Sequence, residues 1–333
     1  MKVALASNVP GRTTTMSPPS MPGGVVVLTG GVGGAKLALG LSQLLPPGQL
    51  TAIVNTGDDF THLGLHVSPD IDTLLYTLSG RAHAVQGWGR QDESWSFMAA
   101  LESLGGENWF RLGDGDLALH VLRTARLRAG EPLSRIVASF ASQWGLSIRV
   151  LPASDERVAT TLDCDEGPLS FQDYFVKRRC EPIVRRIEFD GAAESRPAPG
   201  VVKAIAAAGA ILIAPSNPLL SVAPILAVPG LREALVAASA PVVAVSPLVG
   251  GEAVKGPTAV LMRQLGLPST PRSIATLYDG LIDGLLVDER DASDDLPVPH
   301  AVADTLMHTL DDRVRVASAA LALARELAAM GAR

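Results

Sequence analysis

The 333-residue sequence is poor in cysteine, has no apolar run of membrane length and carries no excess of positive charge. Its two cysteines, Cys164 and Cys180, are too few for a disulfide framework or a four-cysteine zinc site, and they indicate a reducing, cytoplasmic setting. No uncharged apolar run reaches the roughly 18 residues that span a bilayer. The net charge of -6 argues against a nucleic-acid groove or an anionic membrane surface as the main partner. A local basic pocket for a small anionic ligand is compatible with all of these absences.

The first residues of the chain are the part least expected to fold. They are rich in proline, serine and threonine, and their apolar stretch of four residues is too short for a secretory signal. We therefore expect a flexible N-terminal tail over 1–23, with Met16 and Met21 as alternative starts to Met1. The rest of the chain, in a sequence with 47% hydrophobic and 19% charged residues, reads as globular.

An apolar strand, a glycine turn and an amphipathic helix open the folded part of the chain. The strand covers 25–29, the helix about 35–45, and a second strand follows over 50–56. Strand, helix and strand within about 30 residues form a βαβ unit, which predicts a parallel sheet.

The middle of the chain has a different pattern of apolar residues. Stretches with helical periodicity, each ended by glycine, fill residues 73–146, and strands alternating with helices return after them. We therefore predict a Rossmann-like, three-layer α/β fold with a parallel sheet. Its core is expected to consist of 24–72 and 147–333, with a mostly helical insertion over 73–146.

The glycine loop after the first strand matches neither of the two standard phosphate loops. In "TGGVGGAK", Lys36 is followed by Leu37, so the Mg²⁺-binding hydroxyl of a Walker A loop is missing. The dinucleotide fingerprint G-x-G-x-x-G fits at Gly31 and Gly33 but fails at Lys36. Glycines still let the backbone approach a ligand, and a helix N-terminus favours an anion; the alternative is a purely structural turn. The predicted phosphate-binding residues here are Gly30, Gly31, Gly33, Gly34 and Lys36.

Four aspartates follow the second strand in "NTGDDFTHLGLHVSPDIDT". Carboxylates are hard oxygen ligands suited to Mg²⁺, which bridges phosphate oxygens, so we expect metal or substrate binding. The alternative is that these acids only cap turns and helices. The spacing of His62 and His66 in "HLGLH" differs from H-E-x-x-H and argues against a catalytic zinc. The four aspartates are Asp58, Asp59, Asp70 and Asp72.

Two later loops also follow predicted strands. In "APSNPLLS", small hydrogen-bonding side chains are held by prolines, which suits a base, ribose or phosphate, and "SPLVGGEAVKGP" is a second candidate anion nest. A third segment, "RLGDGD", places Arg111 before Asp114 and Asp116, which a capped turn explains equally well. Ligands of an open parallel sheet bind beyond the carboxyl ends of its strands, so the strand-end loops should converge. The candidates in the two later loops are Ser216, Asn217, Ser221, Gly250, Gly251, Lys255 and Gly256.

The sequence has no Ser–His–Asp order, nucleophile elbow or kinase signature. A covalent enzyme intermediate is therefore not expected. Two anion loops, acidic metal ligands and no evident nucleophile fit phosphoryl-group transfer, in which positioning and charge neutralisation do most of the catalysis.

Seven motifs, in order from about residue 24 to residue 330, closely resemble those of the 2-phospho-L-lactate transferase family of coenzyme factor-420 biosynthesis. The resemblance implies a Mg²⁺-dependent, Rossmann-like and often dimeric transferase. It implies that the ribityl hydroxyl of the deazaflavin Fo attacks the phosphorus bonded to a small acid in a guanosine-diphosphate-activated donor, and that GMP leaves. The motifs are "LTGGVGGAKLALGL", "NTGDD", "SPDIDTLLYTL", "RLGDGDLALHVLR", "LPASDERV", "APSNPLLSVAPIL" and "SPLVGGEAVKGP".

The same resemblance implies roles for single residues. Asp72 and Arg111 correspond to Fo-binding positions, and Asp58 and Asp70 to acidic positions that we expect to hold Mg²⁺. We expect the metal on Asp58 to offset charge on the departing GMP, while an acidic residue, with Asp58 and Asp59 as the catalytic candidates, orients the attacking hydroxyl. The "APSNP" and "SPLVGG" loops would hold the guanosine diphosphate moiety.

The resemblance leaves the transferred acid open. Phospholactate, phosphoenolpyruvate and 3-phosphoglycerate are all compatible, because "HLGLHV" fills a segment that varies within the family. The alternative function is a non-catalytic nucleotide-binding regulator resembling the gluconeogenesis factor family, which typically has "DDGGSSG" where Asp58 and Asp59 here lead into "FTHLGLHV". A nicotinamide dehydrogenase is disfavoured by Lys36 at the sixth fingerprint position. The expected partners are small molecules and a second copy of the chain.

Overall fold

The computed structural model of the protein describes residues 21–83, 85–254, 256–293 and 295–331. Lys255, one of the predicted phosphate-binding residues, lies outside them, as do residues 1–20 of the predicted tail. Met21, which we placed in the tail, is buried in the hydrophobic core.

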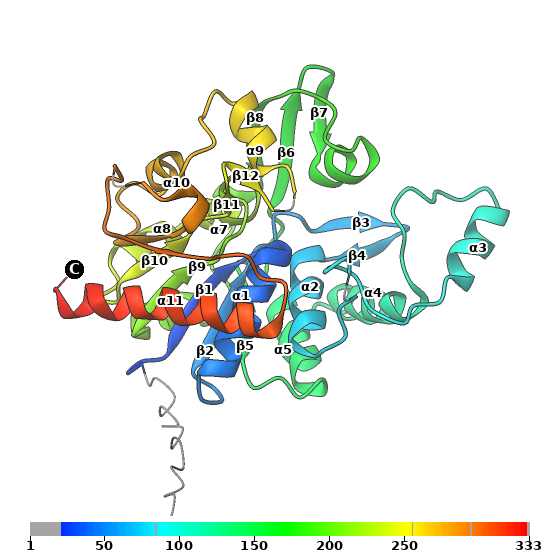
Figure 1. The fold of residues 1–333 in the computed structure, drawn as a ribbon. Helices are drawn as coiled ribbons and strands as arrows, with labels where there is room; N and C mark the ends of the chain where they lie inside the picture. The colour runs from blue at the N-terminus through cyan, green and yellow to red at the C-terminus, as the bar shows by residue number, and fades with distance from the viewer. Residues whose placement is uncertain (1–20, 84, 255, 294, 332–333) are drawn as a thin grey trace, which may run out of the picture.

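Seven parallel strands form the central sheet (Figure 1). Their order is β14-β13-β10-β9-β1-β2-β5, and every neighbouring pair is parallel. Strands buried along their whole length, such as β1 and β13, are typical of a sheet covered on both faces. The predicted parallel α/β fold is confirmed. The strands are β1 (Val25–Thr29), β2 (Leu50–Val54), β5 (Arg149–Pro152), β9 (Ala210–Ile213), β10 (Val242–Val245), β13 (Gly284–Asp288) and β14 (His300–Ala303).

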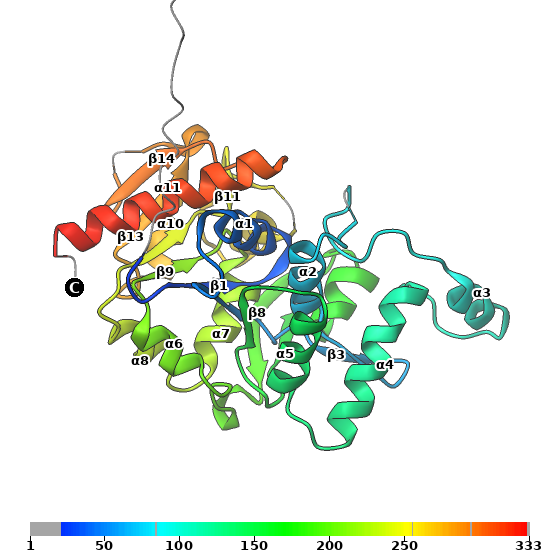
Figure 2. The same ribbon diagram turned by 90° about the horizontal axis from the view of Figure 1, so that it is seen from below.

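Helices cover both faces of this sheet, which gives three layers (Figure 2). Side chains alternate along a strand, so Val25 and Val27 of β1 join one hydrophobic cluster, and Val26 and Leu28 join the other. The first cluster packs against α1 (Gly31–Leu44), α2 (Pro69–Leu78), α5 (Leu133–Gln143) and α11 (Leu310–Ala329). The second packs against α6 (Val201–Ala207), α7 (Ala223–Ala227), α8 (Leu231–Val236), α9 (Thr258–Gln264) and α10 (Pro271–Leu277).

The strand order reverses direction beside β1. The chain runs outward from β1 through β2 and β5, and then returns to fill the other side through β9, β10, β13 and β14. The crevice beyond the carboxyl ends of β1 and β9 is therefore the topological switch point, where open α/β sheets bind ligands. This position brings the glycine loop after β1 beside the "APSNP" loop after β9.

The region that we predicted as a helical insertion contains α3 (Ser96–Ser103) and α4 (Asp114–Arg128) in addition to α5. Figure 1 shows α3 projecting away from the body of the protein. The predicted boundary between residues 72 and 73 falls inside α2, and this helix packs against α1 of the core. Every helix in the described ranges is too short or too polar to cross a membrane.

Three short antiparallel units complete the fold. A three-stranded sheet has the order β7-β6-β8, separate from the parallel sheet. Its β6 alternates buried and half-buried residues, as a strand with one covered face does, whereas central strands of the main sheet, such as β9 and β10, are buried on both faces. These strands are β6 (Ala159–Cys164), β7 (Gly167–Ser170) and β8 (Val184–Asp190), and the hairpins are β3 (Phe60–His62) with β4 (Leu65–Val67) and β11 (Leu248–Val249) with β12 (Glu252–Ala253). Short helical turns are η1 (Asp173–Lys177), η2 (Ala192–Glu194), η3 (Pro218–Val222) and η4 (Glu289–Asp291).

Candidate active site

The glycine loop forms the first turn of α1, which begins at Gly31 rather than near residue 35 as predicted. The Gly30 amide donates a hydrogen bond of 3.3 Å to Ser216 Oγ, and this hydroxyl donates to the Gly30 carbonyl at 2.7 Å. The Gly31 amide donates to Asp70 Oδ1 at 2.7 Å. A Cβ at Gly30 would lie 2.5 Å from Asp70 Oδ2 and 2.7 Å from Ser221 Cβ. Four of the predicted site residues therefore meet around Gly30: Gly31, Asp70, Ser216 and Ser221.

The other glycines of the loop serve two different purposes. A Cβ at Gly33 would lie 2.4 Å from the Pro215 carbonyl oxygen, and one at Gly34 would lie 2.2 Å from Thr29 Oγ1, so both permit close packing. Gly31 has a left-handed φ of 62° and open space where its Cβ would be. Gly31 is thus the point of the loop that a ligand can approach. Lys36 donates from Nζ to the Met307 carbonyl oxygen at 2.5 Å, toward the segment before α11.

Asn55, which directly follows β2, joins the glycine loop to the acidic segment. Its Nδ2 donates to Asp70 Oδ2 at 2.9 Å and to the Leu220 carbonyl at 3.3 Å, and its Oδ1 accepts from the Gly57 amide at 2.8 Å. Sequence reasoning missed this residue, although it lies in the quoted motif "NTGDD".

Asp58 and Asp70 form a buried acidic pair. Burial raises the pKa of Asp58 well above its usual range, and repulsion from Asp70 raises it further. Burial also raises the pKa of Asp70 to about 6, despite the hydrogen bonds from Asn55 and the Gly31 amide. Asp58 Oδ1 is buried with no hydrogen-bond partner among the described residues. A cation bound here would satisfy this oxygen and offset the repulsion.

Asp59 faces a different set of partners. Its Oδ2 accepts from Ser68 Oγ at 2.8 Å and lies 3.1 Å from His66 Nε2, on β4. Its Oδ1 is buried and, within the part of the chain that the structure describes, has no hydrogen-bond partner. Neighbouring side chains therefore hold one oxygen of the Asp59 carboxylate, and the other oxygen can accept a hydrogen bond from a ligand.

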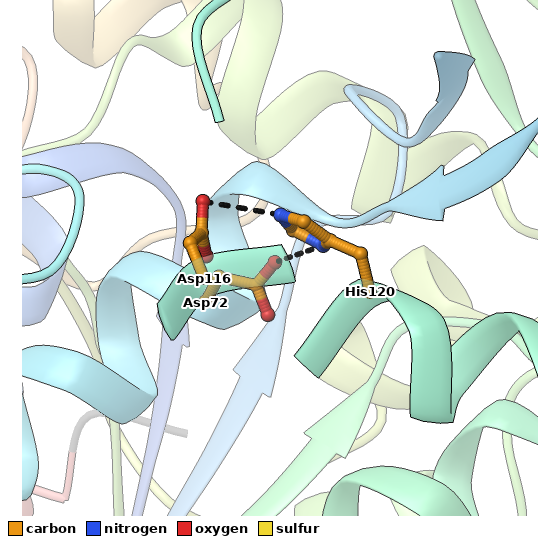
Figure 3. Close-up of side chains that lie close together, drawn as sticks. All are labelled: Asp72, Asp116 and His120. Atoms are coloured by element: carbon orange, nitrogen blue, oxygen red, sulfur yellow. Dashed lines mark ion pairs between the residues drawn. The ribbon is translucent and has the colours of Figure 1, made fainter. Parts of the chain in front are cut away.

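A second buried cluster joins α2 to α4 (Figure 3). Arg123 donates through Nη1 to Asp72 Oδ2 at 3.0 Å and through Nη2 to Asp72 Oδ1. The ring nitrogens of His120 lie 3.7 Å from Asp72 and 3.1 Å from Asp116, and Tyr76 Oη donates to Asp116. Burial raises the pKa of Asp72, although Arg123 and His120 counteract it. Asp72 therefore reaches into a charge network rather than into open space.

Two clusters could thus hold a metal ion. Ligand atoms of Asp72, Asp116 and His120 lie within 4.8 Å of one another, a spacing compatible with a cation. The fully buried Arg123, however, already binds both oxygens of Asp72 and would repel a second cation. The acidic residues after β2 include two buried carboxylate oxygens that no donor of the described residues satisfies, so they fit a divalent cation better.

The remaining predicted residues lie in three other places. Arg111 is exposed, with its guanidinium 4.2 Å from the Trp95 ring centroid, and lines a cleft on α3. Asn217 Oδ1 caps η3 by accepting from the Leu219 and Leu220 amides. The amides of Gly250 and Gly251 both donate to Asp291, at 2.7 Å and 2.6 Å.

The histidine pair of the β3–β4 hairpin is split. His66 faces Asp59, while His62 is buried against the aromatic rings of Phe60, Trp109 and Phe110. Burial lowers the pKa of His62, which favours the neutral form of its ring. The two rings do not form a zinc pair.

Besides Asn55, three functional candidates escaped sequence reasoning: His120, Arg123 and Asp291. Asp116, His120 and Arg123 are spaced i, i+4, i+7 on a stretch that was predicted to be helical, which puts them on one helical face. That spacing was a usable signal for the network. Asp291 had none, because only the fold brings it to the glycines after β10.

The chain is similar to known transferases over most of its length. The family model described as "2-phospho-L-lactate transferase CofD" matches residues 25–325. A phosphoenolpyruvate transferase of Streptomyces griseus is 42% identical over 316 residues, which cover 92% of this chain and 99% of the relative. Proteins of the same name from Thermobifida fusca and Mycobacterium sp. (strain KMS) are 39% and 40% identical, covering 91% and 81% of this chain and 98% and 89% of the relatives.

Solved structures support the fold. A member of the UPF0052 family from Bacillus halodurans superposes with a TM-score of 0.60 at 20% identity, covering 90% of this chain and 99% of that one. A second crystal structure of the same Bacillus halodurans protein, BH3568, gives a TM-score of 0.62 with the same coverage.

Proposed function

Because the chain belongs to the 2-phospho-L-lactate transferase family, we propose that it transfers a phospho-acid group to the deazaflavin Fo in coenzyme factor-420 biosynthesis. The ribityl hydroxyl oxygen forms a bond to the acid-bearing phosphorus of a guanosine-diphosphate-activated donor. The bond from this phosphorus to the bridging oxygen breaks, GMP leaves with that oxygen, and the hydroxyl proton is released.

The favoured donor carries phosphoenolpyruvate. The relatives that are about 40% identical over most of the chain are named phosphoenolpyruvate transferases. The phospholactyl and 3-phosphoglyceryl donors are the competing candidates, and they differ only in the small acid.

The observation that carries the proposal is a pair of buried oxygens, one each on Asp58 and Asp59, that have no hydrogen-bond partner in the described ranges. They lie beyond the carboxyl end of β2, in a segment that Asn55 and Asp70 join to the first turn of α1. Asp58 and Asp70 would hold Mg²⁺, which supplies positive charge to the donor's diphosphate. Asp59, braced on its Oδ2 by Ser68 and His66, presents Oδ1 to accept the hydrogen bond of the attacking hydroxyl.

The donor's phosphates belong at the start of α1. The first amides of a helix are unsatisfied within the helix and attract anions, and Gly31 leaves the approach open. Ser216 and Asp70 hold this turn in place rather than contacting the donor directly.

The test is a turnover assay with Fo, Mg²⁺ and each of the three guanylylated donors, in which GMP release and the mass of the deazaflavin product are followed. We expect product with the phosphoenolpyruvyl donor. Absence of product with every donor would overturn the transferase function, and donor binding without turnover would favour the non-catalytic regulator.

The matched variants for this assay are Asp58→Asn and Asp311→Asn. Asp311 is an exposed aspartate in the first turn of α11, so its variant removes the same charge at the surface. We expect Asp58→Asn to abolish Mg²⁺-dependent turnover and Asp311→Asn to retain it. Full Mg²⁺-dependent turnover by Asp58→Asn would show that Asp58 is not the metal ligand. Light scattering on the same samples tests the expected homodimer.

A further inference from the structure

In the hairpin after β10, two backbone amides bind the carboxylate of another residue of the chain, Asp291. Gly250 and Gly251 have left-handed φ values of 63° and 74°, which turn their two consecutive amides toward one point. The Asp291 carboxylate fills that point and accepts one hydrogen bond on each oxygen, at 2.7 Å and 2.6 Å. Converging backbone amides of this kind also bind phosphate groups.

Asp291 is less buried and has fewer hydrogen-bond partners among the described residues than Asp288, a structural aspartate nearby. Asp288, at the end of β13, is fully buried and accepts hydrogen bonds from the Thr305 amide, Thr305 Oγ1 and Arg290. Asp291 is half-exposed at the end of the three-residue turn η4, and the two glycine amides are its only recorded partners among the described residues. Asp291 can therefore leave without exposing a buried charge.

The location of this contact favours a ligand role. The hairpin follows β10 and η4 follows β13, so both lie at the carboxyl edge of the sheet, where the glycine loop and the acidic segment also lie. A carboxylate and a phosphate group offer the same pair of acceptor oxygens to two amides.

We propose that Gly250 and Gly251 form a phosphate subsite which Asp291 closes in the free protein and vacates when a nucleoside diphosphate binds. This inference rests on the proposed function, since it assigns the subsite to the guanosine diphosphate part of the donor. Asp291 competes with the ligand for the same amides, so it lowers donor affinity and excludes weakly bound anions.

The experiment compares GDP binding to the wild-type chain, Asp291→Ala and Glu289→Ala by calorimetry. Glu289 is an exposed acid of the same turn whose removal subtracts the same charge without vacating the subsite. A subsite closed about nine-tenths of the time lowers apparent affinity about tenfold, so we expect Asp291→Ala to bind GDP up to about tenfold more tightly. Glu289→Ala should stay within about twofold of the wild type, the small effect expected of an exposed charge.

Three outcomes separate the two proposals. Tighter GDP binding by Asp291→Ala alone supports the closed subsite. Equal or weaker binding by Asp291→Ala, with the wild type binding normally, overturns it and makes Asp291 a brace of the loop, whatever the transferase assay shows. Equal tightening in both variants would assign the effect to general charge and also overturn the subsite. Turnover with Fo is measured separately, so its absence would count against the proposed function only.

Discussion

Ser216 and Gly30 exchange two hydrogen bonds across 186 residues of sequence: the Ser216 hydroxyl donates to the Gly30 carbonyl and accepts from the Gly30 amide. Both residues are buried, at the point where the loops after β1 and β9 meet. One hydroxyl thereby bonds to both backbone groups of the residue that precedes α1. The position of the glycine loop depends on this pair.

Replacing Ser216 by alanine should destabilise the protein without removing any charge. The Gly30 amide would stay buried without the acceptor that Ser216 provides, at a cost of about 1–3 kcal/mol. Urea unfolding measures the loss. Ser103→Ala, at the exposed end of α3, removes a hydroxyl that donates to the Ala100 carbonyl and should change stability by less than about 0.5 kcal/mol. Equal stability of the two variants would contradict the bracing role.

Gly31→Ala should reduce activity more than it reduces stability. Its Cβ would enter open space, so the cost is the left-handed backbone, roughly 1–2 kcal/mol. Gly105 has a similar φ of 78° and equally open surroundings, so Gly105→Ala should lose the same stability. Only Gly31→Ala should weaken GDP binding, as measured by calorimetry. If both variants bind GDP like the wild type, the first turn of α1 does not hold the donor.

The sequence was sufficient to predict the parallel sheet, because β1 and β2 are apolar runs joined by an amphipathic helix within one βαβ unit. It also predicted which strand-end loops carry polar residues. The start of α1 at Gly31 was not predictable from propensity, because glycine disfavours helices and only the contacts of Gly30 and Gly31 with Ser216 and Asp70 fix that turn.

Side-chain partners were the part that sequence could not supply. Asp70 was expected as a metal ligand, but its position against the Gly31 amide and Asn55 depends on how α2 packs against α1. The contact between Asp291 and the glycines after β10 depends on the placement of two loops that are 40 residues apart. Such contacts come from tertiary packing, which no local pattern encodes.

The stability of the metal-free protein should fall as the pH rises from about 4 to about 6. The pKa of Asp70 is raised from 3.8 to about 6, so the folded state holds this proton more tightly than the unfolded state. That contribution is fully present below pH 3.8 and is lost as the pH passes the folded pKa. Because Mg²⁺ needs the ionised carboxylates, its stabilising effect should grow over the same range.

Thermal unfolding at pH 5 and pH 7.5, with Mg²⁺ and with a chelator, tests this prediction. We expect a larger Mg²⁺-induced rise in Tm at pH 7.5 than at pH 5. Asp70→Asn should remove most of the difference, and Asp311→Asn should keep it. A Mg²⁺ effect that is the same at both pH values would show that the Asp58–Asp70 pair does not bind the ion.

Removing Arg123 should be costly because it leaves Asp72 buried without its partner. Asp72 is 5% exposed and receives both of its charge-assisted hydrogen bonds from Arg123. Breaking a buried ion pair by removing one partner costs about 3–5 kcal/mol, whereas removing both charges is far less harmful. We therefore expect Arg123→Met to be strongly destabilised, and the double variant Asp72→Asn with Arg123→Met to regain much of the loss in urea unfolding. The single variant should also recover stability at acidic pH, because the unpaired Asp72 then takes up a proton, while the double variant should show no such recovery. If the double variant were as unstable as the single one, the stabilising contribution of Arg123 would be its packing between α2 and α4 rather than its charge.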